Sequence, residues 1–334
     1  MKEIGSAKRF ARLRIALARL AIAALLLLSA PASLFAQTIL RVGHFPNVTH
    51  AQAVVAHGLS RQGRGWFEQR LGSDVTVQWF VYNAGPSAIE AVLAKSIDLT
   101  YVGPNPAINA YARSRGEEVR IIAGAANDGS ALVVQGESSL RSAADFRGKK
   151  IATPQLGNTQ DVAARSWLAA GGLRITQTGG DAQVIPTANP DQLLLFRQKQ
   201  LDAIWTVEPW VSLLEMEASG RVLVQEQDAI TTLLVARVEF LKTQRELTRK
   251  FVTAHEELTD WIIKHPVEAQ RLVREELITE MRANVSEELI ARAWKRIVWT
   301  HEVSRQVLDK IVTSAQAVGF LRNAPDLSRL IEKL

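Results

Sequence analysis

The 334-residue sequence contains no cysteine. Disulfides, thiolate metal sites, a thiol nucleophile and a lipid-attachment cysteine after a leader are therefore excluded. The sequence also lacks a Walker or dinucleotide glycine motif, the G-x-S-x-G turn of serine hydrolases and the H-E-x-x-H spacing of zinc proteases. These absences favour recognition over reaction, so we expect no enzyme activity, no metal and no cofactor.

Long apolar runs are scarce as well, and the clearest one, from Leu20 to Leu28, is short for a membrane span. Basic residues precede this run, and small residues follow it up to Ala36. The pattern predicts a secretory signal peptide over residues 1–36, cleaved after Ala36 or after Ala32. We therefore expect a periplasmic protein.

Without the predicted signal peptide, the leader over residues 1–36, the chain has almost no excess of positive charge. The whole chain has a formal net charge of +6, and its leader holds six Lys and Arg residues with one acid, Glu3, which leaves about +1. A nucleic-acid or membrane-surface role needs a basic face that survives processing. We therefore expect no nucleic-acid partner.

Strands and helices alternate along the remaining chain. Strand patterns occur at 39–44, 75–82, 98–102 and 119–124, and again at 131–134, 149–153, 184–186 and 203–207. This alternation predicts an α/β fold with mainly parallel sheets. The remaining chain of about 300 residues is longer than a single hydrophobic core usually accommodates, so we expect two lobes. One comprises residues 37–129 and 227–334, and the other comprises residues 130–226. Helices are predicted at 244–264, 287–298 and 304–318.

One stretch, residues 151–161, is the strongest candidate for a ligand site. It reads as a strand end, a tight loop and the first turn of a helix that Asn158 and Thr159 can cap. Free backbone N–H groups and the helix dipole at such a loop can hold an anion without a lysine or arginine. The alternative is an ordinary, well-capped loop between a strand and a helix.

Small polar turns follow several other predicted strands, at the edge where open parallel sheets bind ligands. Turns are expected at 85–87 and 103–106, with helices beginning at Ala88 and Ala107. His44 ends the first strand, whereas we expect the other histidines to be solvated or singly hydrogen-bonded. The predicted ligand-binding residues are His44, Asn47, Ser87, Gly103, Pro104, Asn105, Asn127, Gly157, Asn158, Thr159, Gln160, Glu208 and Trp210.

Glu208 leaves the charge of the ligand open. A carboxylate beside an anion site repels the anion unless the ligand also carries a cation. Alternatively, Glu208 precedes Pro209 at a helix start and stabilises the helix dipole. Trp210 could stack on a ligand or pack in the core.

The order of these motifs resembles that of a known family. The matching stretches are 40–43, 85–92, 97–98 and 103–106 in the first half, and 145–152, 157–159, 202–203 and 208–210 in the second. They resemble the periplasmic substrate-binding proteins of ABC importers for aliphatic sulfonates, taurine and nitrate, which are related to thiamine-pyrimidine-precursor binding proteins. Lys95-Ser96 departs from the family, which commonly has a glycine-containing turn there.

The resemblance implies a two-lobed periplasmic-binding-protein fold with a hinge. A small sulfonate- or nitrate-like anion would be clamped between the lobes and delivered by a monomer to an inner-membrane permease with a cytoplasmic ATPase. A taurine-like zwitterion or a thiamine-pyrimidine precursor is the alternative ligand. A biosynthetic enzyme of the same fold would need a cysteine- and histidine-rich iron site, and a sensor domain would need a tethering membrane helix.

Overall fold

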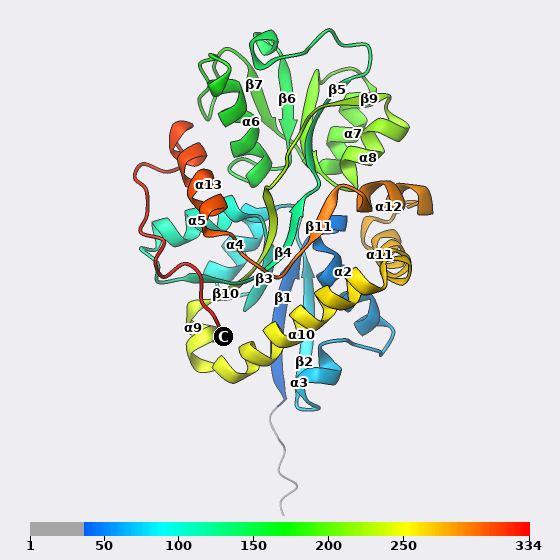
Figure 1. The fold of residues 1–334 in the computed structure, drawn as a ribbon, viewed down its shortest axis with the longest axis vertical. Helices are drawn as coiled ribbons and strands as arrows, with labels where there is room; N and C mark the ends of the chain where they lie inside the picture. Colours follow the sequence, from blue (N-terminus) through cyan, green and yellow to red (C-terminus); the bar gives the residue numbers. More distant parts are fainter. Residues whose placement is uncertain (1–36) are drawn as a thin grey trace, which may run out of the picture. The chain divides into compact units, whose positions relative to one another are not determined.

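The computed structural model describes residues 37–334, which form two β-sheets with helices on both faces of each (Figure 1). The α/β class is therefore confirmed. The predicted signal peptide, residues 1–36, lies outside the described residues, and its cleavage site stays a prediction. Within residues 37–334, no helix combines the length and the apolar character that a membrane span requires.

The first sheet has six strands that come from both ends of the described chain. In spatial order they are β11 (Ile297–Trp299), β4 (Val119–Asp128), β10 (Ile230–Arg237), β3 (Leu99–Val102), β1 (Thr38–His44) and β2 (Val75–Val81). The second sheet has five strands from the middle of the chain. They are β7 (Gln183–Pro186), β6 (Lys150–Thr153), β8 (Ala203–Val207), β5 (Ser130–Gln135) and β9 (Gly220–Gln225).

Both sheets are mixed, and their antiparallel strands differ from the simple parallel pattern expected. β1 pairs with β3 in parallel, as β6 does with β7 and β8. β10, however, lies antiparallel between β3 and β4, and β5 lies antiparallel between β8 and β9. The reason is the path of the chain, which passes from one sheet to the other through β4–β5 and returns through β9–β10.

Helices cover both faces of each sheet. The first sheet is flanked by α2 (Ala51–Arg61), α3 (Glu68–Leu71), α4 (Gly85–Leu93), α5 (Pro104–Arg113), α9 (Val238–Thr243), α10 (Arg245–Lys264), α11 (Pro266–Met281), α12 (Glu287–Trp294) and α13 (Arg305–Ala317). The second is flanked by α6 (Thr159–Ala170) on one face and by α7 (Asn189–Arg197) and α8 (Trp210–Glu217) on the other (Figure 1). Two short 3-10 helices, η1 (Val48–His50) and η2 (Ala143–Phe146), complete the elements.

Alternating side chains on the buried strands build a core on each face. In β5, Leu132 and Val134 point to the α6 face, whereas Ala131 and Val133 point to the α7 and α8 face. This period of two is what a strand buried on both sides requires, and it explains the continuous apolar runs in the sequence.

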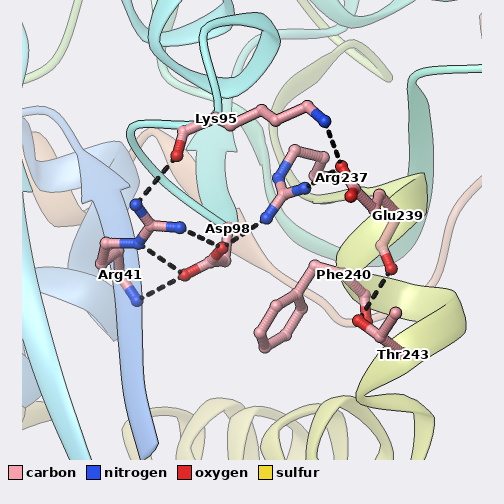
Figure 2. Close-up of polar contacts among 7 residues, drawn as sticks. All are labelled: Arg41, Lys95, Asp98, Arg237, Glu239, Phe240 and Thr243. Atoms are coloured by element: carbon pink, nitrogen blue, oxygen red, sulfur yellow. Dashed lines mark hydrogen bonds and ion pairs between the residues drawn. The ribbon is translucent and has the colours of Figure 1, made fainter.

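Asp98 ties three strands of the first sheet together (Figure 2). It directly precedes β3, and its carboxylate accepts hydrogen bonds from the backbone N–H and guanidinium of Arg41 on β1 and from the guanidinium of Arg237 at the end of β10. Burial alone would raise the pKa of Asp98, but the hydrogen bonds from both arginines outweigh it and lower the pKa below its ordinary 3.8. Lys95 and Glu239 extend the network to the surface.

Several predicted boundaries need correction. The expected turns at 85–87 and 103–106 are the first turns of α4 and α5, because proline suits the first helical positions. The expected helix over 287–298 ends at Trp294, and Ile297–Trp299 form β11 beside β4. The apolar pattern of this short stretch is compatible with the period of a helix and with that of a strand. Its pairing with the distant strand β4 decides its conformation.

Candidate functional site

A small cavity lies where the ends of strands from both sheets meet. The first sheet and its loops contribute Phe45, Asn47, Thr49, His50, Asn83, Ala84, Gly85, Gly103, Pro106 and Thr231, and the second contributes Pro154, Asn158, Thr159, Gln160, Asn189 and Val207. Its volume is about 20 Å³, which holds about one water molecule. A larger solute therefore requires the two sides to separate before it can enter.

The N-termini of four α-helices converge on this cavity. Gly85 begins α4, Gly103 precedes α5, Asn158 precedes α6 and Asn189 begins α7, and all four residues line the cavity. Each helix N-terminus carries a partial positive charge from its dipole and unpaired N–H groups. The cavity is therefore a favourable place for a negatively charged group, although its lining contains no lysine or arginine.

The loop before α6 is held rigidly by the buried carboxylate of Asp161. This group accepts hydrogen bonds from Thr153 Oγ1 and from the N–H of Gly157, both at 2.9 Å, and pairs with the Arg165 guanidinium at 3.1 Å. Gly157 has a φ of +77°, a left-handed conformation that glycine adopts without strain. The loop is therefore preorganised.

Asn158 combines a capping role with a place in the cavity wall. Its side-chain oxygen accepts a hydrogen bond of 2.8 Å from the N–H of Asp161, as an N-cap residue does. Its Nδ2 donates to Gln160 at 3.1 Å. The N–H groups of Thr159 and Gln160 precede the first intrahelical hydrogen bond, so they remain available to a ligand.

The opposite wall is also polar and carries no charge. Burial lowers the pKa of His50 well below its ordinary 6.5, so this imidazole is neutral. The Phe45 N–H donates to His50 Nδ1, which leaves the other ring nitrogen as a donor. Thr49 Oγ1 is buried and has no partner among residues 37–334. Both side chains can therefore bind a ligand.

A second, larger cavity of about 510 Å³ adjoins the first, because Asn47, Asn83 and Asn189 line both. Its other walls are mainly apolar, but they include charged side chains. They consist of Pro46, Pro190, Leu193, Arg197, Trp210, Leu213, Glu217, Glu280, Met281, Ala283, Asn284, Val285 and Leu289. This volume falls within the range of small-molecule sites.

The predicted ligand-binding residues are only partly brought together. Asn47, Gly103, Asn158, Thr159 and Gln160 line the small cavity, and Trp210 lines the larger one while its indole N–H donates to Asn47 at 3.0 Å. Neither of these two cavities is lined by His44, Ser87, Pro104, Asn105, Asn127, Gly157 or Glu208.

Glu208 is buried at the start of α8 and is satisfied by protein groups. Its carboxylate accepts from the N–H and hydroxyl of Ser212, and it pairs with Arg296 at 2.7 Å. Burial raises the pKa of Glu208, although the ion pair with Arg296 opposes this. This geometry is that of a helix-capping carboxylate that also connects the two sides of the molecule.

The expectation of solvated or singly hydrogen-bonded histidines is wrong for two of them. His255 is fully buried, and its two ring nitrogens contact the hydroxyl of Tyr101 and the carbonyl of Gly124. His57 is also buried and contacts His44 and Glu280. His255 lies on the buried face of the amphipathic helix α10, whereas α2 is buried on all sides from Ala51 to Leu59, which includes His57.

The small cavity is also lined by five polar residues that are not among the predicted ligand-binding residues, Thr49, His50, Asn83, Asn189 and Thr231. Asn83 follows β2, and Asn189 precedes Pro190 at a helix start after β7. Both carry the same signal as the residues that were named, a small polar side chain at the carboxyl end of a strand.

Solved structures with this fold include binding proteins for anions. The alkanesulfonate-binding protein SsuA of Xanthomonas axonopodis pv. citri, bound to MOPS, has a TM-score of 0.71 and 20% identity over 89% of this chain and 99% of that chain. The periplasmic nitrate-binding protein NrtA of Synechocystis PCC 6803 has a TM-score of 0.70 and 15% identity, covering 86% of this chain and 83% of that chain. The predicted periplasmic-binding-protein fold is thereby confirmed.

A curated relative from Brucella abortus (strain 2308), provisionally named a binding protein, is 26% identical over 207 residues. The match covers 60% of this chain and 60% of the relative, so the chain spans only about three fifths of that protein's length. The family profile described as NMT1-like matches residues 36–275. Because this match covers most of the sequence, the chain belongs to the NMT1-like family.

Proposed function

We propose that the chain is the solute-binding component of an ABC importer and captures a small organic sulfonate between its two lobes, 37–129 plus 227–334 and 130–226. The observation that carries this proposal is the convergence of four helix N-termini on one cavity whose lining contains no lysine or arginine. Oriented N–H, hydroxyl and amide donors can replace the water around a buried anion.

The adjoining cavity favours a sulfonate over nitrate. Nitrate has no organic body to bury, whereas an alkyl chain attached to a sulfonate can extend past Asn47 and Asn189 to the apolar walls formed by Leu213 and Leu289. Burial of each methylene group contributes about 0.8 kcal/mol. A taurine-like zwitterion is the second candidate because Glu217, which also lines this cavity, could meet its ammonium group.

The remaining parts of the proposal follow from this role. The protein acts as a monomer in the periplasm, binds the solute without chemical change, and hands it to an inner-membrane permease with a cytoplasmic ATPase. The small cavity volume supports a hinge mechanism, in which the ligand selects the closed form because only that form supplies both sets of donors.

A thermal-shift panel on the purified chain tests the proposal. The compounds are an alkanesulfonate, taurine, nitrate and an aminopyrimidine, each compared with sodium chloride at equal ionic strength. A ligand at 100 times its Kd stabilises the folded state by about 2.7 kcal/mol. We expect the alkanesulfonate to give the largest increase in melting temperature. A shift with the aminopyrimidine alone, or with none of the four, would overturn the sulfonate proposal.

A further inference from the structure

Two histidines and a glutamate meet beside the larger cavity. His44 is the last residue of β1, His57 lies on α2 and Glu280 lies in the last turn of α11. His44 Nε2 lies 3.0 Å from His57 Nδ1 and 3.1 Å from Glu280 Oε1, and His57 Nδ1 lies 2.8 Å from Glu280 Oε1. Three atoms with lone pairs therefore form a compact triangle.

The surrounding protein fixes the three groups in place. The side chains of His44 and Glu280 are 0% and 1% exposed, and that of His57 is 9% exposed. Trp79 contacts both rings, edge-on against His44 and stacked on His57. A buried and rigid set of side chains of this kind binds an ion without a large loss of side-chain entropy.

Two neutral imidazoles and a carboxylate cannot satisfy all three contacts of this triangle with protons alone. His44 Nδ1 lies 3.2 Å from the carbonyl oxygen of Phe45, which only accepts, so neutral His44 has its proton on Nδ1 and a lone pair on Nε2. One proton on His57 Nδ1 can serve His44 or Glu280, but the contact between His44 Nε2 and Glu280 Oε1 then joins two acceptors. A cation at the centre satisfies all three lone pairs at once.

We propose that His44, His57 and Glu280 bind a divalent transition-metal ion, with zinc as the best match. Two imidazole nitrogens and one carboxylate oxygen are a common zinc ligand set, and a chain without cysteine has no thiolate ligand to offer. A single point can lie at the usual Zn–N distance of about 2.0–2.1 Å from all three atoms, because the circle that passes through the three atoms has a radius shorter than that distance.

Further contacts support a metal at this place. The Phe45 carbonyl orients His44 through the ring nitrogen that does not face the triangle, as outer-shell groups do for metal-bound histidines. The second carboxylate oxygen of Glu280 is buried without a hydrogen-bond partner among the described residues, so it can complete the coordination. Glu280 also lines the larger cavity, which gives the ion a route and leaves room for a water ligand.

The test is a titration of the purified, EDTA-treated chain with Co²⁺, followed by competition with Zn²⁺. Tetrahedral Co²⁺ absorbs visible light strongly, so its spectrum reports the geometry of the site as well as its occupancy. We expect one equivalent of Co²⁺ to produce these bands, and one equivalent of Zn²⁺ to abolish them. Zn²⁺ alone should also raise the melting temperature of the chain.

Glu280→Gln and His57→Gln keep the side-chain shapes and remove one ligand each, and we expect each to weaken Zn²⁺ binding by at least about 100-fold. His301→Gln is the matched control, because His301 is partly exposed and lies near the carboxylates of Asp260 and Glu302. Circular dichroism verifies that the variants fold. If either variant fails to fold, the Co²⁺ spectrum and the binding stoichiometry of the wild-type chain still test whether the metal site exists. Wild-type chain without tetrahedral Co²⁺ bands, or folded variants with wild-type affinity, would overturn the proposal.

Discussion

Gly103 lies so close to Thr159 that a side chain at position 103 has no space. A Cβ added to Gly103 would lie under 3.0 Å from Thr159 Oγ1 and 3.3 Å from Thr159 Cβ. Gly103 follows β3 in the first sheet, whereas Thr159 begins α6 on the second. The contact therefore joins the two sides of the small cavity. Glycine is required here because there is no space for a side chain, and not because of the backbone conformation, since the φ of −68° at Gly103 suits any residue.

Gly103→Ala should weaken ligand binding without disturbing the fold. The added methyl group keeps the two sides apart, so the closed form loses contacts while each side retains its core. We expect at least a tenfold higher Kd by calorimetry and an unchanged circular dichroism spectrum. Adding Thr159→Ala removes the clashing oxygen and should restore part of the affinity. Wild-type affinity in Gly103→Ala would show that this contact does not belong to the bound state.

Asn158 has two roles that substitution can separate. Asn158→Ala removes the cap of α6 and should cost about 1 kcal/mol of stability in addition to about tenfold in ligand affinity. Asn158→Ser keeps a capping oxygen but removes the amide donor, so it should retain most of the stability and lose affinity. Urea unfolding and calorimetry measure the two effects. Equal affinity in all three proteins would exclude Asn158 from the ligand site.

Asp98 should be one of the most important residues for the stability of the first sheet (Figure 2). Asp98→Asn removes the buried partner of the Arg237 guanidinium and leaves it only the exposed carboxylate of Glu239, and breaking a buried ion pair costs about 3 kcal/mol. Urea unfolding measures the loss. Glu246→Ala, which removes an exposed ion pair with Arg249 on α10, is the control and should leave the melting temperature nearly unchanged. A similar small effect for both variants would contradict the role of Asp98.

The same carboxylate predicts a pH dependence. The pKa of Asp98 is lower in the folded state than its ordinary 3.8, so the unfolded chain binds the proton more tightly. The stabilisation is complete above pH 3.8 and disappears as the pH falls through the lower folded-state pKa. Wild-type protein should therefore lose more unfolding free energy than Asp98→Asn between pH 5 and about pH 3. Parallel stability profiles for the two proteins would disprove this.

Local signals in the sequence were sufficient for much of the fold. The capped loop at Asn158 was predictable because a strand, a polar cap and a helix pattern follow one another within a few residues. The turns at residues 95–98 and 199–202 are also alike. Lys95 and Lys199 both adopt left-handed φ values, and Asp98 and Asp202 both accept a hydrogen bond from the backbone N–H of a neighbouring strand.

Features that depend on distant parts of the chain were not predictable in this way. The antiparallel insertion of β10 beside β3 joins residues more than one hundred positions apart, and no local pattern specifies it. His44 and His57 are 13 residues apart, and Glu280 is a further 223 residues along the chain. Only the packing of α11 against α2 and the end of β1 brings these three side chains together.

A crystal structure of the protein with 2-bromoethanesulfonate tests the proposed sulfonate site most directly, because anomalous scattering locates the bromine. We expect the sulfonate at the helix N-termini, within hydrogen-bond distance of Asn158 or Thr159, and the bromine toward the cavity that Leu213 and Leu289 line. A bromine peak confined to the protein surface, or a sulfonate bound away from these helix N-termini, would contradict it.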